Sequence, residues 1–238
     1  MLVIVGSRHD PAARDLVARW TGHGAALLTC EDLSAPGWRH LPFDRGASWA
    51  VVSGQVVREG EIRGVLVRRP WIIEQELTHI DGPDREYVAA EMNAFLLSWL
   101  AGLPCHVLNR PSGISLCGPN WRPLQWASAA ARAGIAVEAG RWRVPAPRSR
   151  AAGKVPAPAD PAIEVTVVGE RCLGAPSHAF AAGARRLAAI ARVDLLAVRF
   201  GPGAEAPRFV SASAMPSLKT AEVAEAVCDH LRVAAVPA

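Results

Sequence analysis

The chain contains 238 residues with a formal net charge of +4; half of the residues are hydrophobic and a fifth are charged. This length allows one large domain or two small ones, and the composition is typical of a folded soluble protein rather than a disordered one. The small positive charge is spread along the chain, so a nucleic-acid partner is not expected.

The first elements in the chain predict a parallel sheet. Residues 2–5 form an apolar run that indicates a buried strand, and Asp10 followed by Pro11 is typical of the start of a helix. A second apolar run at residues 25–29 completes a βαβ unit. The segments that follow predict a hairpin of strands 49–52 and 55–58, strands at 65–67 and 105–108, and helices at 84–101 and 123–133.

The composition changes at residues 145–161, where five prolines predict a linker without regular structure. Strands and helices mix on both sides of this linker, so we expect an α/β class. Beyond the linker the pattern predicts strands at 163–168, 195–200 and 208–212, and helices at 177–192 and 220–232. The predicted organisation is an α/β domain at 1–137, a proline-rich linker at 138–162 and a smaller α+β unit at 163–238.

Three patterns that often indicate function are weak here. Residues 201–206 match the GxGxxA dinucleotide fingerprint, but Pro202 and the strand that follows favour a hairpin turn. The five cysteines form no CxxC pair, which argues against zinc, and without a recognisable signal peptide they predict free thiols in the cytoplasm. The longest uncharged stretch, residues 92–109, is interrupted by Gly102 and Pro104, so no membrane span is expected.

Four acidic residues precede the helix expected at 84–101: Glu74, Glu76, Asp81 and Asp84. We expect these carboxylates to favour the positive N-terminal end of that helix rather than to bind a metal. The seven histidines are scattered and form no HxH or HxxxH pattern, so the sequence predicts no metal site.

A set of short motifs in a fixed order resembles the ATP-grasp ligases. Arg68-Arg69-Pro70 follows a strand, Asn109-Arg110-Pro111 ends the strand after the long helix, and Gly134-Ile135 follows a further helix. This order is similar to the first domain of the group that includes the graspetide (microviridin-type) peptide ligases and the glutamate ligases acting on ribosomal protein. The resemblance implies a pre-ATP-grasp-like N-terminal βαβ domain.

The second half resembles the C-terminal subdomain of the same family. Residues 195–200 and 209–216 are similar to the strand–turn–strand that carries its metal-binding acids. In the family, an Asp, then a Glu and an Asn two residues apart, hold magnesium, and the matching positions here are Arg199, Ser211 and Ser213. Mg²⁺ needs carboxylate oxygen, so a cation stands where the ion should be.

Two further parts of the family pattern do not match. The lid subdomain that covers the nucleotide would fall at residues 138–162, which are too few to form it. A lysine that contacts the triphosphate normally lies at the start of the helix after the Asn-Arg-Pro strand, where this chain has Trp121 and Arg122. All but two of the 26 basic residues are arginines, and Lys154 lies in the linker. The resemblance therefore implies a truncated ATP-grasp subdomain without its lid.

These departures predict a non-catalytic ATP-grasp-like protein that needs no cofactor. It would bind a peptide, a small acidic ligand or a partner protein, which could be an active ATP-grasp ligase, in a cytoplasmic modification pathway. The high apolar fraction is also compatible with a homodimer. Strand ends and the loops after them converge in α/β proteins, which places a ligand cleft there. The residues expected to line it are Arg68, Arg69, Asn109, Arg122, Arg199, Ser211 and Ser213.

Three alternatives stay open at this point. The chain could be an ATP- and Mg-dependent carboxylate–amine ligase acting on a peptide, with arginines on the phosphates or a lid supplied by a second chain. Arg68 and Arg69 could form internal salt bridges instead of facing a ligand. The chain could also be an unrelated α/β protein. A hairpin that carries Arg199, Ser211 and Ser213 on one face would argue against that last alternative.

Overall fold

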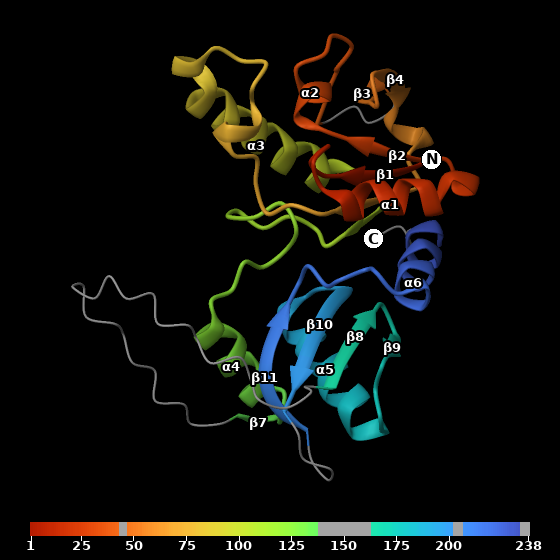
Figure 1. Cartoon of the computed structure of the whole chain (residues 1–238), viewed down its shortest axis with the longest axis vertical. Coiled ribbons are helices and arrows are strands. Elements are labelled where there is room, and N and C mark those ends of the chain that lie inside the picture. The colour runs from red at the N-terminus through yellow and green to blue at the C-terminus, as the bar shows by residue number, and fades with distance from the viewer. Residues whose placement is uncertain (43–46, 138–162, 202–206, 234–238) are drawn as a thin grey trace, which may run out of the picture.

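The computed structural model describes residues 1–42, 47–137, 163–201 and 207–233, which form two sheets and a hairpin (Figure 1). The first sheet is parallel throughout. Its strands in spatial order are β2 (Ala25–Leu28), β1 (Leu2–Val5), β5 (Gly64–Val67) and β6 (His106–Leu108). The chain passes from β1 to β2 on one side and then to β5 on the other, so the strand order reverses between β1 and β5.

Both faces of the first sheet are buried, as is typical of parallel strands. Around this sheet lie α1 (Pro11–Arg19), α2 (Cys30–Leu33), β3 (Trp49–Val52), β4 (Gln55–Arg58), α3 (Arg85–Gly102) and α6 (Ala221–Arg232). Val3 and Val5 face a core that α3 and the β3–β4 hairpin complete, whereas Leu2 and Ile4 face a core that α1 and α6 complete. As predicted, α1 begins after Asp10, whose carboxylate accepts a hydrogen bond from the Ala12 N–H at 2.9 Å.

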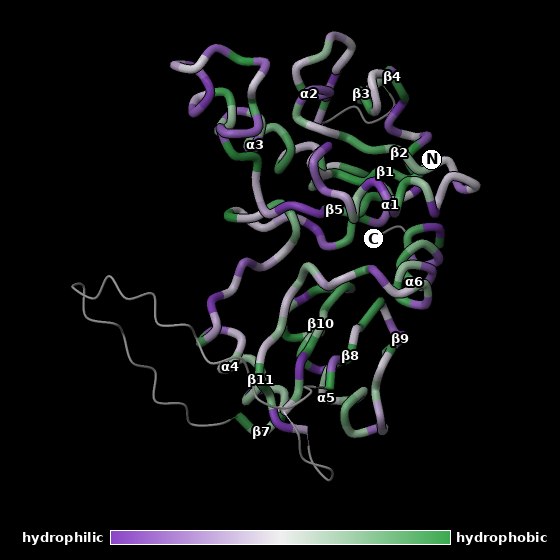
Figure 2. The backbone as a smooth tube through the Cα atoms, in the orientation of Figure 1, coloured by the Kyte–Doolittle hydropathy of each residue, from purple (hydrophilic) through white to green (hydrophobic). Residues whose placement is uncertain are grey.

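The second sheet is antiparallel except where β7 pairs with β11. Its strands in spatial order are β7 (Ala136–Val137), β11 (Arg208–Ser213), β10 (Leu195–Phe200), β8 (Ile163–Val168) and β9 (Arg171–Leu173). One face packs on α4 (Pro123–Arg132) and α5 (His178–Ala191). On the other face, α6 covers the end formed by Val168, Leu173 and Leu195, and the rest carries polar side chains. Figure 2 shows hydrophobic residues along the central strands of both sheets.

The α/β class is confirmed, and each predicted strand and helix is present with its ends displaced by one residue at most. Among the α-helices and strands of the described residues, the sequence prediction missed α2, β7 and β9; it also missed the short 3-10 turns. The antiparallel pairing of β10 with β11 confirms the hairpin, so the GxGxxA match does not open a helix. The proline-rich segment at 138–162 lies outside the described residues, as do residues 202–206 of the turn.

The division at residue 137 stays a prediction. α4 and β7 precede that position, but they pack on the second sheet, against α5 and β11. α6 follows the second sheet in the chain, but it packs against the first. All five cysteines are free thiols. Within the described segments, none of the helices combines the length and hydrophobicity that a membrane crossing requires.

A pair of histidines lies where the two halves meet. The rings of His106 on β6 and His230 on α6 have centroids 5.2 Å apart, and the His230 ring packs on the backbone of Gly169. Burial lowers the pKa of His230, the Asp194 carboxylate acts in the opposite direction, and His106 adds a smaller lowering effect. The folded protein therefore favours the neutral form of His230.

We expect the free energy of unfolding to fall as the pH drops through about 6.5, the ordinary pKa of histidine. Below that pH the unfolded chain binds a proton on His230 that the folded chain does not, until the lower folded-state pKa is reached. The contribution of His230 to the free energy of unfolding is therefore complete above the ordinary pKa of histidine. It is lost as the pH falls from there to the lower pKa of the folded state. Urea unfolding in neutral and mildly acidic buffer checks this, and His230→Gln should lose less stability than the unsubstituted protein. Equal losses would contradict the prediction.

Candidate functional site

The uncovered face of the second sheet carries a group of polar side chains. Val165 and Val167 on β8 point into the core with α4 and α5, so Glu164 and Thr166 point to the opposite face. On that face Arg199 of β10 lies between Glu164 on one side and Ser211 of β11 on the other. The structure thus places the polar positions of three neighbouring strands together.

Three of the expected cleft residues share this face. Arg199 is opposite Ser211 in the β10–β11 register, and Ser213 is two residues further along β11, opposite Ala197. Because strand side chains alternate, Arg199, Ser211 and Ser213 point the same way. This is the arrangement that argues against an unrelated α/β fold.

The electrostatics of this group are those of a weak ion pair beside two hydroxyls. Arg199 Nε lies 3.9 Å from Glu164 Oε2, and both side chains are nearly half exposed, so the pair contributes about 0–1 kcal/mol at most. The Ser213 hydroxyl donates to the Met215 carbonyl and accepts from the Met215 N–H, each at 3.2 Å. Ser213 is therefore engaged in the turn after β11.

These residues do not fit a magnesium ion. Mg²⁺ selects carboxylates and water in an octahedral arrangement. Among the described residues, Glu164 is the one carboxylate that pairs with this group, and it already lies across from a guanidinium. Elsewhere in the described residues, no three His, Cys, Asp or Glu side chains come together in a way that could hold a metal.

A cavity of about 250 Å³ opens beside this group, between β8, β9 and the start of α6. Its walls include Glu164 and Thr166 from β8, and Thr220 and Glu222 at the start of α6. The Thr166 side chain is buried at 5% exposure. The cavity could admit a small polar group, and the alternation of Glu164 and Thr166 with valines is the sequence signal that would have revealed this face.

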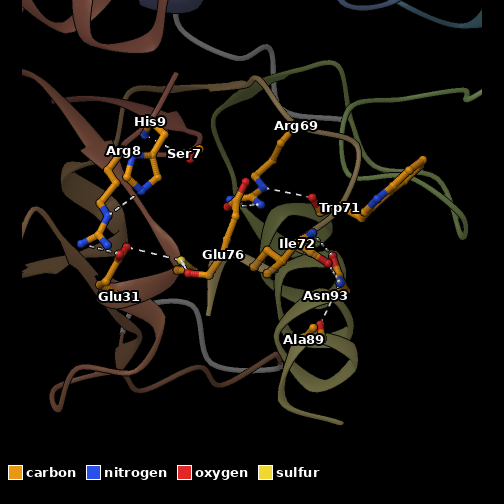
Figure 3. A network of polar contacts seen from close by, with 11 residues as sticks. Ser7, Arg8, His9, Glu31, Arg69, Trp71, Ile72, Glu76, Ala89 and Asn93 are labelled. Carbon is orange, nitrogen blue, oxygen red and sulfur yellow. Dashed lines mark hydrogen bonds and ion pairs between the residues drawn. The ribbon is translucent and has the colours of Figure 1, made fainter. Parts of the chain in front are cut away.

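Arg68 and Arg69 are held by internal ion pairs at the carboxyl end of β5, and Figure 3 shows the pair of Arg69 with Glu76. Arg68 Nε lies 3.0 Å from Asp10 Oδ2, on the carboxylate that also caps α1. Arg69 is buried; it donates to Glu76 Oε2 at 2.7 Å and to the Trp71 carbonyl at 3.1 Å. The alternative of internal salt bridges is therefore what the structure shows for both arginines.

Asn109, which follows β6 of the first sheet, bonds to residues at the ends of β10 and β11 in the second sheet. Its Nδ2 donates to the carbonyls of Leu195 at 2.8 Å and Ala214 at 3.2 Å. Its Oδ1 accepts from the N–H groups of Asp194 at 3.1 Å and Leu195 at 2.9 Å. The side chain is 3% exposed and fully engaged. Arg122, in contrast, is exposed at the start of α4, on the side of the second sheet away from Arg199.

The cysteines do not offer a nucleophile. Burial raises the pKa of all five thiols, that of Cys30 to about 11 and that of Cys105 to about 11. At Cys30 the hydrogen bond from its Sγ to the Glu31 carboxylate, at 3.3 Å, raises the pKa further. A thiol that stays protonated at neutral pH is a poor nucleophile.

The sequence matches no family model and no curated protein. The fold, however, is similar to that of several solved structures. One is the macrocyclase MdnC from Microcystis aeruginosa MRC, bound with precursor peptide MdnA, at a TM-score of 0.66 and 12% identity. That similarity covers 97% of this chain and 99% of MdnC.

Two further structures give the same result. The ATP-grasp ligase PsnB, complexed with a phosphomimetic variant of its minimal precursor, Mg and ADP, has a TM-score of 0.64 and 14% identity over 97% of both chains. The Chryseobacterium gregarium RiPP-associated ATP-grasp ligase, in complex with ADP and a leader and core peptide, has a TM-score of 0.61 and 13% identity. This similarity covers 99% of the present chain and 97% of the Chryseobacterium gregarium ligase. The chain therefore has an ATP-grasp-like fold.

Proposed function

We propose that this chain is a non-catalytic ATP-grasp-like protein that binds a peptide in a peptide-modification pathway. The observation that carries the proposal is the placement of Arg199 opposite Ser211, with Ser213 beside them, on the face where the ATP-grasp resemblance expects metal-binding acids. The context of peptide modification is supported by the structural neighbours, ATP-grasp ligases complexed with precursor peptides.

The physical reason lies in how phosphoryl transfer is catalysed. The reaction depends on positioning the phosphates and neutralising their charge, mostly by metal ions and cationic side chains. A divalent cation brought to Arg199 would meet a positive charge, and Coulomb repulsion at an intermediate dielectric would oppose its binding by several kcal/mol. A fold that keeps its strands but presents Arg199, Ser211 and Ser213 is better suited to holding a ligand than to activating ATP.

We expect isothermal titration of the purified protein with ATP to give no saturable heat, with or without Mg²⁺. We also expect no Mg-dependent ATP hydrolysis, because the residues on the open face provide no ligand set for the ion. PsnB, which is an ATP-grasp ligase, serves as the positive control under the same conditions. Mg-dependent turnover by the pure protein would overturn the proposal.

The second candidate function is an ATP-dependent carboxylate–amine ligase that modifies a peptide with a lid supplied by another chain. It is supported by the polar cavity of about 250 Å³ beside Thr166 and by neighbours that contain ADP, one of them with Mg as well. In that case the pure protein would be inactive, but ATP turnover would appear on mixing with an ATP-grasp ligase made inactive by substitution. No gain on mixing would leave the binding function as the supported one.

A further inference from the structure

A group of large apolar side chains is exposed where the chain enters α3. Trp71 is 44% exposed, Ile73 39% and Tyr87 69%. All three belong to the segment between β5 and the first turn of α3, which lies at one corner of the molecule (Figure 1). Large exposed apolar side chains beside polar ones are typical of interaction surfaces.

This segment is held firmly against the rest of the protein. Asn93 on α3 accepts the N–H of Ile72 at 2.8 Å and donates to its carbonyl at 3.0 Å, as Figure 3 shows. Ile72 is buried, so its neighbours Trp71 and Ile73 are directed outward. The Arg69–Glu76 ion pair fixes the same segment from the other side. A surface that is already ordered loses little conformational entropy when a partner binds.

A shallow cavity of about 350 Å³ lies beside Ile73, between residues 73–75 and the first turns of α3. Its walls include Glu74, Glu86 and Ala89. Within the described parts of the chain, neither carboxylate forms an ion pair; Glu74 accepts a hydrogen bond from Gln75. Asp84, at the N-cap of α3, makes no side-chain capping bond. The carboxylates of Glu74, Asp84 and Glu86 are therefore not all occupied by contacts at the start of α3.

The charge of this corner is opposite to that of the chain. Residues 71–91 contain six of the 22 acidic residues and a single basic one, Arg85, whereas the chain as a whole has a net charge of +4. Arg85 Nε donates to the Ile80 carbonyl. Glu76 is paired with Arg69, and the remaining carboxylates still give the corner a negative charge next to apolar surface, which attracts cations and repels phosphate groups and acidic lipids.

We propose that this corner, formed by Trp71, Ile73, Glu74, Glu86 and Tyr87, binds a peptide segment in which basic side chains flank an apolar one. The inference rests on the proposed peptide-binding function and names the chemistry of the peptide. The apolar side chain enters the cavity beside Ile73, and lysines or arginines pair with Glu74 and Glu86. Trp71 and Tyr87 supply apolar contact and cation–π attraction.

The test uses the full-length protein and a short fluorescein-labelled peptide in which lysines alternate with leucines, separated by Gly and Ser. Fluorescence anisotropy should show saturable binding that weakens as salt is added. The double variant Glu74→Lys/Glu86→Lys should bind at least about tenfold more weakly and lose the salt dependence. The double variant Ile73→Ser/Tyr87→Ser should bind at least about tenfold more weakly and keep it.

Matched controls separate this corner from the rest of the surface. Leu124→Ser removes an apolar side chain on α4 whose exposure lies between those of Ile73 and Tyr87, and Glu225→Lys reverses an exposed charge on α6; both variants should bind as the unsubstituted protein does. Glu86→Gln is a milder second variant should charge reversal disturb α3. Circular dichroism and thermal unfolding establish that each variant is folded.

Three results would overturn the inference: no saturable binding, equal binding of a peptide with glutamates in place of lysines, or corner variants that bind as tightly as the controls. A concentration-dependent dimer that the Ile73→Ser/Tyr87→Ser variant abolishes would show instead that a second copy occupies the corner. The binding is measured without nucleotide, so Mg-dependent ATP turnover would overturn the proposed non-catalytic function without touching this result.

Discussion

Replacing Asn109 with alanine is expected to lower the free energy of unfolding by about 4 kcal/mol. The substitution would leave two backbone carbonyls and two backbone N–H groups without the side chain that now pairs with them. The site is buried, so water has poor access, and each unpaired group costs about 1–3 kcal/mol before relaxation. Urea unfolding followed by circular dichroism measures the change.

The matched control is Asn120→Ala, because Asn120 is exposed in the same loop region. That substitution should change the free energy of unfolding by no more than about 0.5 kcal/mol. A loss at Asn109 as small as the one at Asn120 would mean that the four bonds do not join the two halves. Asn109→Asp should be intermediate, because it keeps the acceptor for Asp194 and Leu195 and loses the donor.

Gly64→Ala is expected to lower the free energy of unfolding by about 2–3 kcal/mol. Gly64 begins β5 at its contact with α6, and a Cβ atom there would lie 2.5 Å from the Leu231 carbonyl oxygen and 2.8 Å from the Leu231 Cβ. Backbone atoms of a packed helix cannot move aside as a flexible side chain can, so α6 must shift. Thermal unfolding measures the effect.

Gly60→Ala provides the control for the same chemical change. A Cβ at Gly60 would meet no atom within 4 Å, so the variant should be as stable as the unsubstituted protein or slightly more stable. If Gly64→Ala were equally harmless, the packing of α6 on β5 would be looser than the structure shows.

Local signals explain what could be predicted from the sequence. The start of α1 depends on Asp10 and Pro11, and the β3–β4 hairpin on Ser53-Gly54, so both were predictable from neighbouring residues. The order of short motifs carried the ATP-grasp resemblance, and the fold similarity found at 12–14% identity agrees with it. The shared face of Arg199 and Ser211 followed from strand alternation across one hairpin.

The partners of the candidate site residues could not be predicted, because they are far away in the chain. Asn109 bonds to Leu195, 86 residues later, and Arg68 pairs with Asp10, 58 residues earlier. Glu164 reaches Arg199 only because β8 and β10 pair across the intervening α5. No local pattern encodes such pairings. From the sequence alone, an arginine after a strand is therefore equally compatible with a contact to a ligand and with an internal ion pair.

The position of α6 has a consequence for how the protein is made. This helix is synthesised after both sheets, but its Val227 and Leu231 bury one face of the first sheet, whose strands come before residue 109. Until residues 221–232 leave the ribosome, Leu2, Ile4 and Leu66 have no complete core to enter. The N-terminal strands therefore depend on a helix that is made after the second sheet, so the first sheet is fully buried only once the chain has passed residue 232.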